Sequence, residues 1–103
     1  MASMKIIHHF SSGVYVKETY FDAGESGEKH IHDFDHLSTL VAGMVRLQVD
    51  NEIRVLTGPK VLTIKAGKSH KVTAITPAIW HCTHATDCTD PEEVDAAILK
   101  TEA

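Results

Sequence analysis

The chain has 103 residues, 43% of them hydrophobic, and a formal net charge of −4 with histidine neutral. This length allows one domain with a modest core. The acidic balance argues against a nucleic-acid partner, which would require a basic surface. No apolar run approaches the roughly 20 residues of a membrane-spanning helix, so no membrane partner is expected either.

Short β-prone runs separated by turn residues predict an all-β fold of the sandwich or barrel type. The connections between these runs carry glycine, proline or polar residues, which favour tight turns. The expected strands cover residues 5–10, 14–21, 37–42, 44–49, 53–56, 61–65, 72–75 and 78–86. We therefore expect a single domain over residues 1–103, with its barrel over about residues 5–86.

The C-terminal segment is the one part of the chain with a helical pattern. Asp90 is a suitable N-cap and Pro91 suits the first helical position. Apolar residues then recur with the spacing of one helix face: Val94, Ala97 and Ile98. We expect a short helix over about residues 91–101 that packs on the barrel.

Cysteine content and the N-terminal residues bear on the compartment. Cys82 and Cys88 are the two cysteines, and the apolar stretch within residues 1–10 is too short for a secretion signal. A structural disulfide is therefore not expected. We expect reduced thiols and a cytoplasmic protein.

The unusual feature of the sequence is its eight histidines. His30 and His32 are separated by one residue, so an extended backbone presents both imidazoles on the same side. His36 follows after a bend, and His70 comes later, on the turn formed by residues 66–69. A first-row transition metal needs three or four nitrogen or oxygen ligands that converge from different segments, which this arrangement supplies. We predict one divalent ion (Mn, Fe, Zn or Ni) bound by His30, His32, His36 and His70.

This stretch resembles the first motif of the cupin family. That motif reads Gly, five residues, His-x-His, three or four residues, Glu, six residues, Gly. The chain has Gly24, His30, His32, His36 and Gly43 at this spacing, with histidine in the acidic position. In this pattern the chain is similar to small cupins that bind manganese or iron through four histidines.

The second cupin motif is matched in part. It reads Gly, five residues, Pro-x-Gly, two residues, His, three residues, Asn. Gly67 and His70 match it, Lys65 and Ala74 replace the proline and the asparagine, and the first glycine is displaced by one position, to Gly58. The resemblance implies a cupin double-stranded β-helix, a jelly-roll barrel with the metal ion inside.

The resemblance implies a divalent-metal-binding protein with a small-molecule ligand. Four neutral imidazoles would leave the charge of the ion uncompensated, so anionic ligands should be attracted. Three functions stay open: a metal-dependent dioxygenase acting on a small anionic or enolisable substrate, a metal-dependent isomerase or lyase, and a non-catalytic module that binds a small molecule or metal. The candidates for a general base are Tyr15, Tyr20, His81 and His84.

The last predicted strand carries further polar groups. Trp80, Cys82 and His84 share one face of it, and His81 lies on the other. Two interpretations of Cys82 and His84 stay open: they form a pocket wall or second site, or they are ordinary strand packing.

A homodimer is also expected. Small cupins commonly pair, and apolar strand edges near the N-terminus need to be covered. Residues 5–10 are the candidates for a shared sheet.

Overall fold

The computed structural model describes residues 5–27, 30–31, 34–87 and 89, and within them all regular secondary structure is β-strand. The strands are β1 (Lys5–Ser11), β2 (Val14–Phe21), β3 (His30–Ile31), β4 (His36–Ala42), β5 (Met44–Val49), β6 (Glu52–Thr57), β7 (Lys60–Ile64), β8 (Ser69–Ala74) and β9 (Ala78–Ala85). The predicted all-β class is confirmed. The predicted helix at 91–101 lies outside the described residues. The described part of the chain contains no helix long and apolar enough to cross a membrane.

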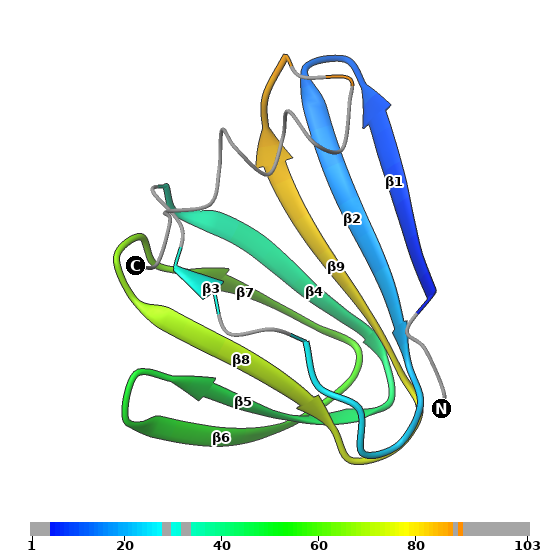
Figure 1. Cartoon of the computed structure of the whole chain (residues 1–103), viewed down its shortest axis with the longest axis vertical. Coiled ribbons are helices and arrows are strands. Elements are labelled where there is room, and N and C mark those ends of the chain that lie inside the picture. The colour runs from blue at the N-terminus through cyan, green and yellow to red at the C-terminus, as the bar shows by residue number, and fades with distance from the viewer. Residues whose placement is uncertain (1–4, 28–29, 32–33, 88, 90–103) are drawn as a thin grey trace.

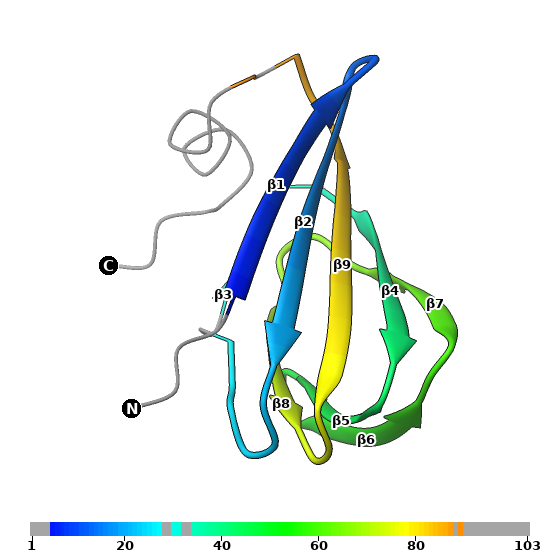
Figure 2. The same cartoon turned by 90° about the vertical axis from the view of Figure 1, so that its right-hand side faces the viewer.

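The strands form two layers, one of five strands in the order β1-β2-β9-β4-β7 and one of four in the order β3-β8-β5-β6. Every strand pair is antiparallel, and β9 enters the larger sheet between β2 and β4. β1 and β2 extend beyond the smaller sheet (Figure 1), and β1 is the end of the larger layer that lies away from β5 and β6 (Figure 2). This arrangement agrees with the predicted jelly-roll barrel.

The core lies between the layers because alternate residues of each strand face inward. Leu40 of β4 and Val45 of β5 are fully buried, and Leu47, Ile64 and Trp80 are nearly so. Each such side chain contributes about 1.5–3 kcal/mol by leaving water. The core is therefore built mainly from the middle of the barrel toward one end, which leaves the other end available to polar groups.

Strand β8 begins earlier than the sequence indicated. His70 was expected on the turn at 66–69, but it is the second residue of a strand. The reason is pairing on both sides: His70 is opposite His30 of β3 and opposite Val49 of β5. Turn-forming residues mark where a chain reverses, but these two partners are distant in sequence and extend the strand into the expected turn.

Two of the glycines in the matched motifs have different structural requirements. Gly43 has φ +93° and approaches the loop before β9 so closely that a Cβ atom would lie 2.3 Å from the Pro77 carbonyl oxygen. Gly24 has φ +86°, but a Cβ atom there would meet nothing within 4 Å. Both positions favour glycine for its backbone freedom, and Gly43 also has no room for a side chain.

We predict that Gly43→Ala is far more destabilising than Gly24→Ala. The free energy of unfolding of the Gly24 variant should fall by about 1–2 kcal/mol, because alanine is strained in the left-handed backbone conformation. That of the Gly43 variant should fall by about 3 kcal/mol or more, because the clash with Pro77 adds to the same backbone strain. Urea unfolding of both variants measures the difference, and equal losses would mean that the close approach at Gly43 is not a constraint.

The edge strand β1 keeps the homodimer prediction open. Among the described residues no strand pairs with its outer edge, and Ile6 is 39% exposed. We predict a dimer of the 11.3 kDa chain in sedimentation at micromolar concentration. Ile6→Lys should shift it toward monomer because a charge would be buried at the interface. Ile53→Lys, on the other sheet, is the matched control. A wild-type protein that sediments only as monomer would refute the prediction.

Candidate metal centre

Histidines from both sheets meet at one end of the barrel. His36 is the first residue of β4 in the larger sheet, and His70 lies on β8 in the smaller sheet. Each is only 5% exposed, and their ring centroids are 5.7 Å apart with the ring planes inclined by 52°. Imidazole nitrogens bind first-row metals at about 2.0–2.1 Å, so two rings on one ion have centroids within about 6 Å. The separation of this pair satisfies that limit.

His30 is brought to the same end by strand pairing. Its backbone lies directly opposite that of His70 in the pairing of β3 with β8. The side chain of His30 and the whole of His32 lie outside what the structure describes. Among the described side chains, which do not include those two, no group of three or more His, Cys, Asp or Glu residues is arranged to hold a metal ion.

A third buried histidine, His84, lies beside His36. It comes from β9, is 6% exposed, and its ring stacks on that of His36 with centroids 4.4 Å apart and planes 27° apart. The sequence named it only as a candidate general base and as part of a possible pocket wall or second site, not as a neighbour of His36. The available signal was the alternation of Trp80, Cys82 and His84, which places all three on one strand face. Of the two interpretations left open, the structure supports the pocket wall for His84.

A buried hydrogen-bond network lies behind His36. The Trp80 indole N–H donates to the Cys82 sulfur at 3.2 Å, and the Ser38 hydroxyl donates to the same sulfur at 3.6 Å. Ser38 Oγ also lies 3.1 Å from His36 Nε2. With its proton directed at the sulfur, the Ser38 oxygen is placed to accept from His36 Nε2–H. In that tautomer of His36 the lone pair is on Nδ1, a buried atom.

Cys82 takes part in this network as a thiol. Burial raises the pKa of the Cys82 thiol, although the hydrogen bonds from Ser38 and Trp80 act in the opposite direction. The thiolate is the form of cysteine that binds metals. Burial thus opposes formation of the thiolate, and Cys82 accepts hydrogen bonds from Ser38 and Trp80 behind His36.

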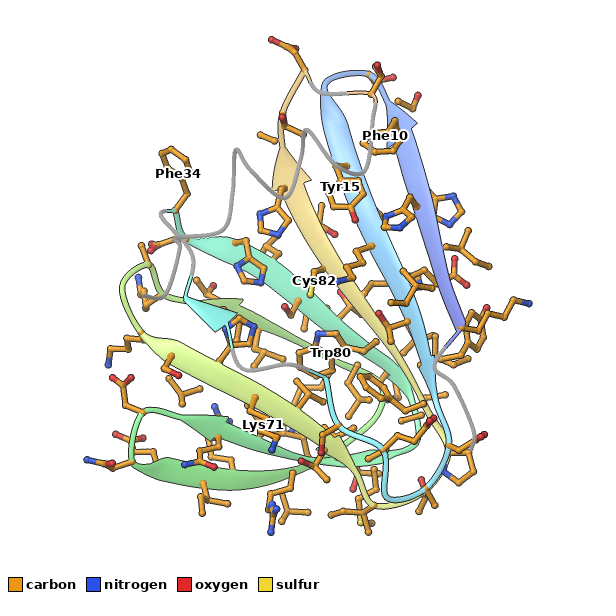
Figure 3. The ribbon with its side chains drawn as sticks, viewed as in Figure 1. Phe10, Tyr15, Phe34, Lys71, Trp80 and Cys82 are labelled. Atoms are coloured by element: carbon orange, nitrogen blue, oxygen red, sulfur yellow. The ribbon has the colours of Figure 1, made fainter. Side chains whose placement is uncertain are left out.

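The candidate general bases divide between the two faces of the larger sheet. Tyr15 is fully buried, its ring lies 6.3 Å from that of His84, and its hydroxyl is 2.7 Å from His8 Nδ1. Figure 3 shows Tyr15, Cys82 and Trp80 on the inner side of the sheet. Tyr20 instead donates a hydrogen bond to Glu18 on the outer face.

His81 is also on that outer face, opposite Glu18 in the pairing of β2 with β9. Strand alternation is the reason for the division, because odd and even positions of a strand face opposite ways. Tyr20 and His81 are therefore excluded as bases for an interior site, and Tyr15 and His84 are retained.

Asp35 connects the two segments that carry His36 and His70. Its Oδ1 accepts a hydrogen bond from the Ala66 backbone N–H at 2.8 Å, and its Oδ2 lies 3.4 Å from Lys65 Nζ. The hydrogen bond from Ala66, with Lys65 as a smaller contribution, lowers the pKa of the Asp35 carboxyl. The chain entering β4 is thereby attached to the turn that precedes β8.

A cleft gives access to the histidines from outside. It has a volume of about 590 Å³, and His36 and His84 are among its lining residues. Phe34, at the rim, is 64% exposed and points away from the barrel (Figure 3). A small molecule can therefore reach this end of the barrel.

Comparison with known proteins supports the fold. A cupin superfamily protein from Desulfitobacterium hafniense has a TM-score of 0.73 at 20% identity, with 82% of this chain and 79% of that chain covered. KdgF from Halomonas sp. has a TM-score of 0.65 at 22% identity, with 78% and 74% covered. A salicylate 1,2-dioxygenase variant from Pseudoaminobacter salicylatoxidans has a TM-score of 0.74 at 9% identity, with 91% of this chain but 28% of that chain covered.

No family model matches the sequence, and no curated protein matches it. At these identities the structural likeness establishes the fold and not the activity. The chain has the cupin fold, a double-stranded β-helix, as the sequence motifs predicted.

Proposed function

We propose that this protein binds one divalent transition-metal ion through His30, His32, His36 and His70, and presents it to a small anionic ligand. The observation that carries the proposal is the meeting of His36 and His70 from opposite sheets, both buried, with ring centroids 5.7 Å apart. The pairing of His30 with His70 supports the inclusion of the segment that also holds His32.

The chemistry of the described donors fits a metal ion. Burying an imidazole in a barrel costs free energy unless a partner satisfies its polar atoms. The Nδ1 atoms of His36 and His70 are both buried, and Ser38 is placed to hold the His36 proton on the opposite nitrogen. Metal-binding histidines commonly have such a partner on their second nitrogen, because it fixes the tautomer and the ring orientation.

The reaction we favour within this proposal is oxygenation of a small anionic or enolisable substrate. Its support is the fold likeness to the salicylate 1,2-dioxygenase variant together with a histidine-rich site open to a cleft. The bound ion would supply Lewis acidity and, if redox-active, reactivity toward oxygen. In this chain His84 and Leu37 would line the approach, and the Trp80–Cys82–Ser38 network would keep the His36 ring oriented.

A second candidate is a metal-dependent isomerase or lyase. It is favoured by the imidazole of His84 and the hydroxyl of Tyr15, since such chemistry needs a proton acceptor that is not itself a ligand. Tyr15 Oη is held by His8 Nδ1 at 2.7 Å, so a proton at this hydroxyl has a connection toward the surface. Oxygen consumption distinguishes the two reactions, because only the oxygenase consumes oxygen. A protein that only binds metal and ligand would catalyse neither reaction.

We predict that His70→Ala removes most of the metal from protein purified without added metal. Wild-type protein should contain about one divalent ion per chain by elemental analysis, because all four imidazoles act together. His32→Ala should behave like His70→Ala. His81→Ala, on the outer face of the same barrel, is the matched control and should keep full occupancy. Equal metal content in His70→Ala and His81→Ala, with both variants folded by circular dichroism, would contradict the ligand assignment.

A further inference from the structure

The inner face of β6 carries two polar residues, Glu52 and Arg54, before its buried residue Leu56. Ile53 and Val55 point away from the core and are 59% and 61% exposed. Arg54 instead shares the register position of Leu47 of β5, on the inward side, and is itself exposed at the edge of the sheet. A strand at a barrel edge normally turns its β-branched residues inward. Departures of this kind from the local rule are expected where a strand serves a ligand.

Arg54 lines a cavity between the open edges of the two sheets. β6 and β7 are the last strands of their sheets, and the cavity between them has a volume of about 150 Å³. Its apolar part includes Leu47 and Ile64, which belong to the core. The space is small, so it suits a compact molecule and not a large ligand.

The charge of this cavity opposes that of the whole protein. Arg54, Lys65 and Lys68 line it together with a single acidic residue, Glu52, whereas the chain carries a net charge of −4. Lys65 also forms an ion pair with Asp35. Among the described residues neither Arg54 nor Lys68 forms an ion pair. A guanidinium group in this setting recognises a carboxylate through two parallel hydrogen bonds.

We infer that the cavity between β6 and β7 binds a small carboxylate with a short apolar tail. The carboxylate lies between Arg54 and Lys68, and the tail contacts Val49 and Leu62, the partly buried apolar residues of the lining. The inference goes beyond the metal proposal, since no lining residue is a predicted ligand. The cavity nevertheless adjoins the histidines, because Val49 and Ile64, which line it, are paired with His70 and His36 in the two sheets.

The test is a titration of butyrate into protein treated with a chelator, followed by NMR of the methyl groups. Saturable shifts at Val49 and Leu62 are expected, with little response to 1-butanol at the same concentrations because it lacks the charge. Arg54→Gln should weaken butyrate binding about tenfold. Arg46→Gln is the matched control: it removes the same charge from the outer face of β5 and should change the affinity less than twofold. The butyrate affinity of Arg54→Lys should lie between those of the two glutamine variants, because lysine keeps the charge but lacks the paired N–H donors of the guanidinium group.

Four results would overturn the inference, of which three concern the protein treated with a chelator. They are equal affinities in Arg54→Gln and Arg46→Gln, shifts centred on residues outside the cavity, and binding of 1-butanol as tight as that of butyrate. Butyrate binding that requires added metal and shifts residues around His36 would also overturn it, while supporting the metal proposal. Loss of metal in the histidine variants is measured separately, so a failure of either proposal can be recognised without the other.

Discussion

The pairing of β8 with strands on both of its sides is the constraint on which the candidate site depends. It fixes His70 between His30 and Val49 at one end of the smaller sheet. Because the larger sheet places His36 at the same end, the two imidazoles face each other across the barrel without any direct connection along the chain. Moving the register of β8 by one residue would turn His70 to the outer face and separate the pair.

The inner faces of three strands change from polar to apolar in the same direction. β4 presents His36, Ser38 and then Leu40, and β9 in reverse chain order presents His84, Cys82 and Trp80. β8 contributes His70 followed by Val72 and Ala74. The barrel thus has a histidine layer at one end, an intermediate polar layer and an apolar layer that supplies the core. Buried imidazoles reduce stability by themselves, and a ligand that binds only the folded state would offset this cost.

Much of the fold was predictable from local patterns. Val14–Phe21 and Met44–Val49 are strands with the predicted limits, because β-branched runs between turn residues identify strands directly. The limits of β8 were wrong, because they depend on partners that local sequence does not reveal. The motif glycines were recognised by spacing, but the reason for Gly43, its approach to Pro77, exists only in the folded chain.

The site was predictable to a smaller extent. The close spacing of His30, His32 and His36 indicated a cluster, and the structure brings His36 and His70 together. His84 was named as a candidate base and pocket-wall residue, but its proximity to His36 was not predictable, because it follows from the pairing of β4 with β9 and not from spacing. Tyr20 was proposed on residue type alone, and strand alternation places it on the wrong face. Arg54 had no sequence signal, because its place on the inner side of β6 can be recognised only once the register of β6 with β5 is known.

X-ray absorption spectroscopy of protein purified without added metal tests the central claim most directly, because it reports the atoms bound to the ion. We expect one divalent first-row metal with a first shell of nitrogen or oxygen at about 2.0–2.3 Å and the outer-shell scattering of several imidazole rings. A shell dominated by sulfur at about 2.3 Å, or a metal without imidazole scattering, would contradict it. Protein that binds no divalent metal even when it is supplied would contradict it equally.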